Sequence, residues 1–247
     1  MKKLLYYLIL FVLFLISLYS VTQIYDILKE NNEEKKQNNY LSEIAKRDDN
    51  EEKDEKKKEK EIKIDFEALK KVNDEIIAWI KIPDTTIDYA IVQGIDNDYY
   101  LHYNAMKEEN YAGAVFVDCQ NESPFKDKHT IVYAHNVKHG TMFAPLEKFG
   151  DADFFNKHPV YYIYTPETNY EVEIFAFYTT TDVSDAYELV DIDPYIAKWQ
   201  SESLYCSDVK VNNGDCIVTL STCSYERNNQ PSELRHVLKG VLKEINK

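Results

Sequence analysis

Three side chains in this sequence have the chemical types needed for acyl transfer through a thioester. Cys223 ends the apolar run 216–223, His135 ends the apolar run 130–135, and Arg235 follows the cysteine by twelve residues. A thiolate is a strong nucleophile, and an imidazole can carry a proton near neutral pH. A guanidinium stays charged and can stabilise a thiolate or an oxyanion. The set therefore predicts an enzyme that works through a covalent acyl intermediate.

Each of these residues also has an ordinary structural explanation. Most free cysteines are small buried hydrophobic residues, and a histidine at a strand end can simply bond to loop backbone. Arg227 competes with Arg235, because it lies only four residues after Cys223 in a polar stretch. Arg235 is the better candidate, because it belongs to a strand that can pair beside the cysteine strand. The spacing of His129, His135 and His139 matches no zinc pattern, so we predict no metal and no cofactor.

The other cysteines do not form a disulfide framework. If Cys223 is catalytic, an odd number remains, namely Cys119, Cys206 and Cys216. We expect free thiols, although Cys206 and Cys216 flank a turn-rich segment and can in principle pair.

Short runs of β-branched and aromatic residues, separated by Asn, Asp, Gly and Pro, predict a closed or sandwiched β domain. Helices are expected after the N-cap Asp65, around residues 143–149, and after the N-cap Asp193 with Pro194 at the first position. Cys223, His135 and Arg235 all lie at strand ends, where a side chain is both fixed and reachable. The predicted strands are 76–82, 86–92, 113–117, 130–135, 160–164, 170–178, 216–223 and 235–245.

The N-terminus predicts a membrane anchor. Residues 4–21 are uncharged and mostly apolar, follow Lys2 and Lys3, and as a helix would be about 27 Å long, close to the thickness of a hydrocarbon core. A cleaved signal peptide is the competing interpretation, but no small-residue cleavage site follows. We expect a single-pass protein of the cell membrane, with a cytoplasmic N-terminus and an extracellular catalytic domain.

Composition divides the rest of the chain in two. Residues 26–64 are strongly charged and lack Gly and Pro, which predicts a linker that cannot fold alone. The expected organisation is therefore an anchor over 1–25, a linker over 26–64 and a catalytic domain over 65–247.

With 29 Lys and Arg against 43 Asp and Glu, the net charge of −14 excludes a nucleic-acid partner, which needs a basic surface. A basic substrate or a solubility effect fits this charge.

The candidate residues lie in motifs that occur together in one known family. Thr219-Leu-Ser-Thr-Cys223, Tyr133-Ala-His135-Asn136 and Arg235-His-Val-Leu resemble the cysteine, histidine and arginine signatures of the class B sortases. Supporting matches follow in the family's order at 73–83, 87–93, 96–101, 113–118 and 140–143. The resemblance implies a mostly β fold, an eight-stranded sortase-type β-barrel with N-terminal helices. It also implies a helix inserted before the cysteine strand, at 193–204, and a separate N-terminal transmembrane helix.

The resemblance further implies the reaction. Sortases cut a C-terminal sorting signal on a secreted protein, hold that protein as a thioester, and pass it to an amine of a peptidoglycan precursor. By this resemblance Cys223 is the nucleophile, His135 the general acid and base, and Arg235 the oxyanion or substrate-positioning group. Class B members typically accept signals like Asn-Pro-x-Thr-Asn. The substrate-binding residues implied are Asn97, Leu101, Ser221 and Thr222.

Three alternatives remain open from the sequence. A hydrolytic thiol peptidase would release a free acid, whereas a transpeptidase diverts the product to an added amine. A pilin-polymerising sortase would use a pilin lysine as acceptor. A non-catalytic module that binds a sorting signal would keep its cellular role without Cys223.

Overall fold

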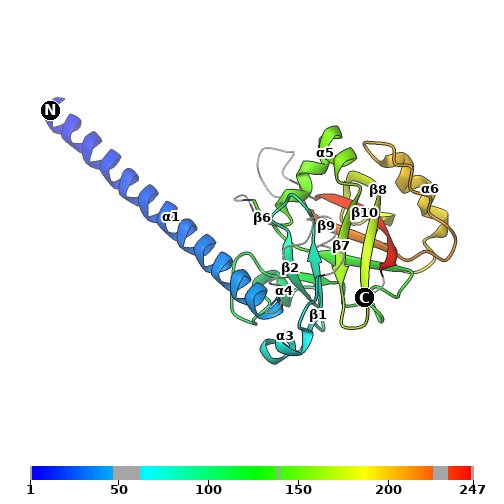
Figure 1. Ribbon diagram of the computed structural model, residues 1–247. Helices are drawn as coiled ribbons and strands as arrows, with labels where there is room; N and C mark the ends of the chain where they lie inside the picture. Colours follow the sequence, from blue (N-terminus) through cyan, green and yellow to red (C-terminus); the bar gives the residue numbers. More distant parts are fainter. Residues whose placement is uncertain (1, 47–61, 138–139, 225–232, 246–247) are drawn as a thin grey trace. The chain divides into compact units, whose positions relative to one another are not determined.

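The structure is a computed structural model that describes residues 2–46, 62–137, 140–224 and 233–245 (Figure 1). The chain forms two compact units, Met1–Asn39 and Tyr40–Lys247. The first unit is part of one helix, and the second holds a β-barrel with its covering helices. The candidate residues all belong to the second unit.

The N-terminal helix α1 runs over Lys2–Ala45, past the end of the predicted anchor. Its segment Lys3–Thr22 is long and apolar enough to cross a membrane, as expected from the sequence. The last turns of α1 belong to the barrel unit, where Leu41, Ile44 and Ala45 are buried. The helix therefore takes up the first part of the segment predicted as a linker.

Eight strands close into a barrel in the order β1-β2-β3-β4-β9-β10-β8-β7, which confirms the predicted fold class. Alternate side chains point into a core of aliphatic and aromatic residues, as the strand periodicity requires. The strands are β1 (Ile76–Lys81), β2 (Asp88–Val92), β3 (Val115–Val117), β4 (His129–Tyr133), β7 (Val160–Tyr164), β8 (Asn169–Thr181), β9 (Ile217–Cys223) and β10 (Leu234–Ile245).

Two strand pairs of the barrel are parallel, and one of them matters for the site. β2 pairs with β3 in parallel, and β4 pairs with β9 in parallel. Because parallel strands run the same way, the residues that follow Tyr133 on β4 and Ser221 on β9 reach the same rim of the barrel. β10 runs antiparallel to β9, so its first residues lie at that rim as well.

The predicted helices are present, with one correction at a cap. The Asp65 carboxylate accepts a hydrogen bond of 2.8 Å from the Ala68 amide and caps α3 (Phe66–Val72). The helix predicted before the cysteine strand is α6 (Asp193–Glu202), but its N-cap is Ile192, so the prediction of Asp193 as the cap was wrong. Asp193 instead lies in the first turn, where a carboxylate complements the helix dipole. The stretch 143–149 contains a 3-10 helix, η1 (Ala144–Gly150).

Several short elements carry too few residues to show a period and were not predicted. They are α4 (Tyr99–His102), α5 (Ala152–Lys157), the 3-10 turn η2 (Asp185–Tyr187), and a two-stranded sheet of β5 (Asn136–Val137) and β6 (Thr141–Met142).

The end of α1 is held to the barrel by a polar cluster as well as by apolar contacts. The Lys46 ammonium lies 2.7 and 2.8 Å from the two Asp88 carboxylate oxygens, and the Trp79 indole donates to the same carboxylate at 2.6 Å. The Asp65 amide donates to the Ala45 carbonyl at 2.9 Å, which joins the start of α3 to the end of α1.

Candidate active site

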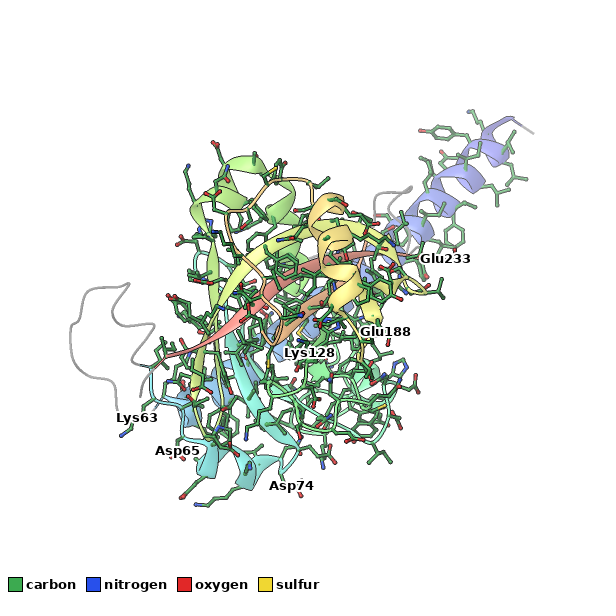
Figure 2. All side chains as sticks on the ribbon, turned by 90° about the vertical axis from the view of Figure 1, so that its right-hand side faces the viewer. Lys63, Asp65, Asp74, Lys128, Glu188 and Glu233 are labelled. Atoms are coloured by element: carbon green, nitrogen blue, oxygen red, sulfur yellow. The ribbon has the colours of Figure 1, made fainter. Side chains whose placement is uncertain are left out.

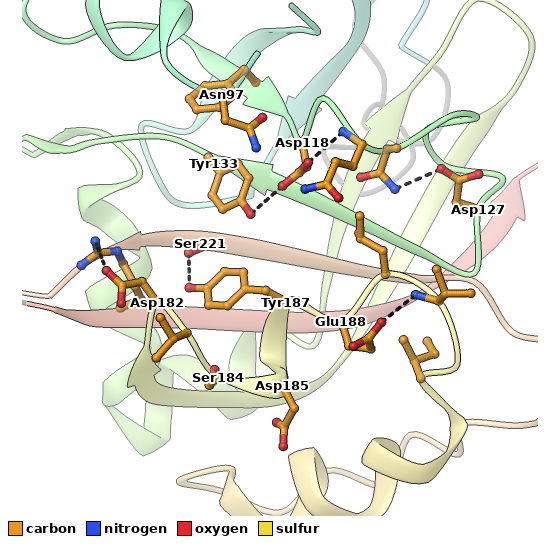
Figure 3. A pocket seen from close by; sticks show the side chains of 18 of the residues that line it. Asn97, Asp118, Asp127, Tyr133, Asp182, Ser184, Asp185, Tyr187, Glu188 and Ser221 are labelled. Carbon is orange, nitrogen blue, oxygen red and sulfur yellow. Dashed lines mark hydrogen bonds and ion pairs between the residues drawn. The ribbon is translucent and has the colours of Figure 1, made fainter. Parts of the chain in front are cut away.

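A groove of about 1390 Å³ lies at the barrel rim where β4 and β9 end. It runs between the segment 182–192 that precedes α6 and the segment 118–128 between β3 and β4 (Figure 3). All seven candidate residues line it, so the structure brings the whole predicted set together: Cys223, His135, Arg235, Asn97, Leu101, Ser221 and Thr222.

Cys223 and Arg235 are neighbours across two paired strands. Cys223 is the last residue of β9, and Arg235 lies directly opposite it on β10. Residues opposite each other in an antiparallel pair point to the same face, with Cβ atoms about 4.5–5.5 Å apart. Both side chains therefore extend from the same face of the sheet, and both residues line the groove.

Arg235 is oriented by two contacts near the groove. One of its amino groups donates to the Asp182 carboxylate at 3.0 Å, and the other donates to the Leu234 carbonyl at 3.0 Å. Asp182 follows β8 and was not among the predicted residues, because it lies far from the cysteine motif in the sequence. The competing Arg227 falls outside the residues that the structure describes.

His135 is oriented by a backbone carbonyl. Its Nε2 atom lies 2.9 Å from the Leu101 carbonyl oxygen in α4. A carbonyl can only accept, so Nε2 carries the proton, and Nδ1 is the nitrogen that can exchange a proton with a reacting group. Leu101 therefore contributes a carbonyl to the site in addition to its side chain.

Asn136 ties the histidine segment to the cysteine. Its side-chain amide donates to the Cys223 carbonyl at 2.8 Å and to the Glu147 carboxylate at 2.6 Å. The amide thus uses its two protons to join β9, β5 and η1. The sequence placed Asn136 in a motif without assigning it this role.

The remaining candidates have defined partners within the protein. Thr222 donates to the Ala134 carbonyl at 2.8 Å and is buried, so it links the cysteine and histidine strands. The Asn97 side-chain oxygen accepts from the Cys119 amide at 2.8 Å. The Ser221 hydroxyl lies 2.8 Å from that of Tyr187, as Figure 3 shows.

Two stacked tyrosines line the groove next to the catalytic candidates. The rings of Tyr133 and Tyr187 lie 6.2 Å apart at 19°. The Tyr133 hydroxyl donates to the Asp118 carboxylate at 2.9 Å. Burial raises the pKa of Tyr187 to about 12, so its hydroxyl stays protonated. The two residues give the groove part of its aromatic lining.

Carboxylates outnumber cations along the groove. Figure 2 is turned so that α6 faces the viewer, and it labels Lys128 and Glu188, which both line the groove. Lys128 pairs with Asp193 at 3.2 Å, which neutralises one of the acidic side chains. The lining carboxylates are Asp118, Glu122, Asp127, Asp182, Asp185, Glu188, Asp191 and Asp193.

Comparison with known proteins identifies the family. A family model described as a sortase domain matches residues 80–243. The chain belongs to the sortase family. Sortase B of Listeria monocytogenes is 44% identical over 187 residues, which cover 74% of this chain and 75% of that protein. Sortase B of Staphylococcus aureus is 32% identical over 171 residues, covering 67% of this chain and 70% of that protein.

Solved structures agree with this assignment. The crystal structure of sortase B from B. anthracis, at 35% identity, has a TM-score of 0.73 and covers 88% of this chain and 100% of that one. A Staphylococcus aureus sortase B–substrate complex, at 30% identity, has a TM-score of 0.68 and covers 73% of this chain and 85% of that one. The predicted resemblance to class B sortases is confirmed, and the chain is a member of a family of cysteine transpeptidases.

Proposed function

We propose that the protein is a membrane-anchored class B sortase that joins secreted proteins to an amine of the cell wall. Its donor would be a C-terminal sorting signal like Asn-Pro-x-Thr-Asn. Its acceptor would be an amine of a peptidoglycan precursor. The observation that carries the proposal is that Cys223, His135 and Arg235 line a single groove, with Cys223 and Arg235 on paired strands and His135 two residues after the end of β4.

In the first half of the proposed reaction, the Cys223 thiolate attacks the carbonyl carbon of the scissile peptide bond. The negative charge on the carbonyl oxygen is stabilised by the guanidinium of Arg235, the residue that pairs with Cys223 across β9 and β10. As the intermediate collapses, the carbon–nitrogen bond breaks and His135, which starts this step as an imidazolium, gives the proton on Nδ1 to the leaving amine and keeps the Nε2 proton on the Leu101 carbonyl. The products are a thioester on Cys223 and a released C-terminal peptide.

In the second half, the acceptor amine attacks the thioester carbonyl. His135 takes a proton from the amine, the carbon–sulfur bond breaks, and Cys223 leaves as a thiolate. The new bond is an amide, so the atoms and charges of the cycle balance. The acidic lining of the groove favours the approach of a cationic acceptor over an anionic one.

We also propose the membrane arrangement that the sequence predicts. The apolar segment Lys3–Thr22 would cross the membrane once, with the N-terminal lysines in the cytoplasm and the barrel outside. This arrangement would place the groove on the side where secreted proteins and peptidoglycan precursors meet.

The experiment that tests the proposal incubates the full chain in detergent with a panel of sorting-signal peptides, with and without a short amine acceptor. Mass spectrometry should find a peptide that is cleaved, an acyl adduct on Cys223, and an amide product that appears only with the amine. Free acid that persists at saturating amine would instead indicate a hydrolytic peptidase.

Cys223→Ala is the matched control, because it removes the thiol and keeps a small side chain at the end of β9. It should form no adduct and no product. Cys119→Ala should retain activity, since Cys119 lies outside the groove lining and its thiol has a raised pKa from burial. Adduct formation on Cys119 would overturn the assignment of the nucleophile.

A further inference from the structure

Three consecutive residues beside the groove, Ala186, Tyr187 and Glu188, are each bonded to a different strand of the barrel, and the last two of them line the groove. The Ala186 carbonyl accepts from Lys239 on β10 at 2.9 Å. Tyr187 bonds through its hydroxyl to Ser221 on β9 at 2.8 Å. The Glu188 carbonyl lies 2.6 Å from Nδ1 of His129 on β4. The segment 186–188 is therefore held at every residue.

The two side chains that bond to the carbonyls of Ala186 and Glu188, Lys239 and His129, are connected to each other beneath the segment 186–188. The Thr219 hydroxyl on β9 lies 2.7 Å from the Lys239 Nζ atom and 2.7 Å from the His129 Nε2 atom. Lys239, Thr219 and His129 are all fully buried, and none of them lines the groove. A continuous series of hydrogen bonds therefore links the Ala186 carbonyl to the Glu188 carbonyl through the three buried side chains, and Tyr187 lies between these two carbonyls in the sequence.

With a neutral His129, only one assignment of protons lets every group in this series of hydrogen bonds find a donor or an acceptor. Nδ1 of His129 must carry a proton, because the Glu188 carbonyl can only accept. A neutral His129 then accepts at Nε2 from the Thr219 hydroxyl, whose oxygen accepts in turn from Lys239. Burial lowers the pKa of both Lys239 and His129 well below their ordinary values, which agrees with a neutral ring.

Burying the Lys239 ammonium away from water costs free energy unless its hydrogen bonds and charge interactions compensate. Its Nζ atom lies 3.7 Å from the centre of the Trp199 ring in α6. Within the described part of the chain, no carboxylate forms an ion pair with it at 4 Å or less. A methionine or leucine at this position would satisfy the packing without the desolvation cost. What the lysine adds is a directed hydrogen bond to the carbonyl before Tyr187.

We infer that Lys239, Thr219 and His129 are positioning residues that fix the segment 186–188, and with it Tyr187, for recognition of the donor peptide. They act through Tyr187 and touch no substrate themselves. The inference rests on the proposed function, because it concerns the wall of the same groove. It adds a buried determinant of donor affinity that lies under the site.

The test is a double-mutant cycle on the full chain, with Thr219→Val, Tyr187→Ala and the combination of both. Thr219→Val keeps the shape of the side chain and removes the hydroxyl that joins Lys239 to His129. It should raise KM for the donor peptide about tenfold and change kcat less than twofold. In the Tyr187→Ala background, the same substitution should change KM less than twofold, because its effect acts through Tyr187.

Two controls separate positioning from a loss of stability. Val241→Ala changes a buried residue of the same face of β10 that has no bond to the segment, and it should lower Tm while KM stays at the wild-type value. Alkylation of Cys223 by iodoacetamide should proceed at the wild-type rate in Thr219→Val. If Thr219→Val does not fold, Lys239→Met replaces it in the same cycle.

The outcomes distinguish this inference from the proposed function. A wild-type chain that cleaves no peptide of the panel would overturn the proposed function. If the wild-type chain is active, two results would overturn the positioning role alone. One is a wild-type KM in Thr219→Val, and the other is a KM change in the double mutant equal to the product of the changes in the two single mutants.

Discussion

At the scale of single residues, the site depends on strand register. A shift of β10 by one residue would turn Arg235 to the other face of the sheet and leave Cys223 opposite His236 or Leu234. The register is set by the apolar residues of β10 that pack in the core. The chemistry of the groove therefore depends on packing along the same strand.

Arg235→Ala should lower kcat/KM for the donor peptide by about 10²–10³, as loss of one oxyanion donor does in other acyl-transfer enzymes. Asp182→Asn should cost less than tenfold, because the ion pair with Arg235 is partly exposed and such pairs contribute little. Steady-state kinetics on both variants checks this. Arg227→Ala is the decisive comparison: a large loss there with an active Arg235→Ala would reverse the assignment of the two arginines.

The sequence predicted these catalytic candidates because their motifs are local. It could not predict Asp182, the Leu101 carbonyl or the Asn136 contact with Cys223, since each depends on which distant segments meet at the rim. A sequence pattern does not predict which backbone carbonyl will accept a hydrogen bond from a catalytic side chain. The cap of α6 was also misassigned, because Ile192 precedes the favourable pair of Asp193 and Pro194 and has no capping side chain of its own.

At the scale of elements, long strands were predicted well and short elements were not. The alternation in 170–178 and the apolar run in 216–223 gave β8 and β9 to within a few residues. α4 has four residues, too few for any periodicity, yet it supplies the carbonyl that orients His135. The barrel was thus predictable from its strands, whereas the positioning of the histidine was not.

Gly113→Ala tests the role of α4. Gly113 has φ +61°, and a Cβ atom there would lie 2.5 Å from the Tyr100 carbonyl oxygen and 2.9 Å from that of Leu101. Because both oxygens are backbone, α4 or the chain at Gly113 must shift, and we expect this shift to disturb the bond from His135 to Leu101. We expect kcat/KM to fall at least tenfold and the pH profile of kcat/KM to shift, since the partner of the imidazole changes.

Gly94→Ala is the matched control. A Cβ atom there would lie 3.2 Å from the buried Tyr100 ring, and its three nearest atoms include none of the α4 backbone. It should keep the wild-type pH profile. A wild-type profile in Gly113→Ala as well would show that the Leu101 carbonyl does not orient His135.

At the scale of the whole molecule, the barrel unit begins before the predicted domain boundary. Leu41, Ile44 and Ala45 are buried, and Lys46 pairs with Asp88. A chain of residues 65–247 lacks these contacts, whereas a chain of residues 40–247 keeps them. Burial of one Leu or Ile contributes about 1.5–3 kcal/mol, so the shorter chain should melt roughly 5–10 °C lower. Calorimetry of the two chains measures this, and equal Tm values would contradict it.

The buried histidine gives the fold a predictable response to acid. The pKa of His129 is well below its ordinary value in the folded state, so only the unfolded chain binds the proton as the pH falls below about 6.5. Unfolding is then favoured, and this group alone contributes a loss of up to about 1.4 kcal/mol per pH unit. Urea unfolding between pH 7.5 and 4.5 should show a shallower loss in His129→Gln.

His102→Gln is the matched control for this comparison, because it removes a histidine from an exposed position and not from the core. An equal slope in wild type and His129→Gln would mean that the ring is protonated in the folded state.

The parallel pairing of β4 with β9 also has a consequence for the order of folding. Asn136 and Cys223 are bonded although they are 87 positions apart in the chain. Contacts of such long sequence separation form late, after the entropy of closing a large loop has been overcome. The thiol of Cys223 can therefore pair early with the nearby Arg235, but it meets His135 only when β4 and β9 have paired, and a partly synthesised or partly folded chain carries a cysteine without its histidine.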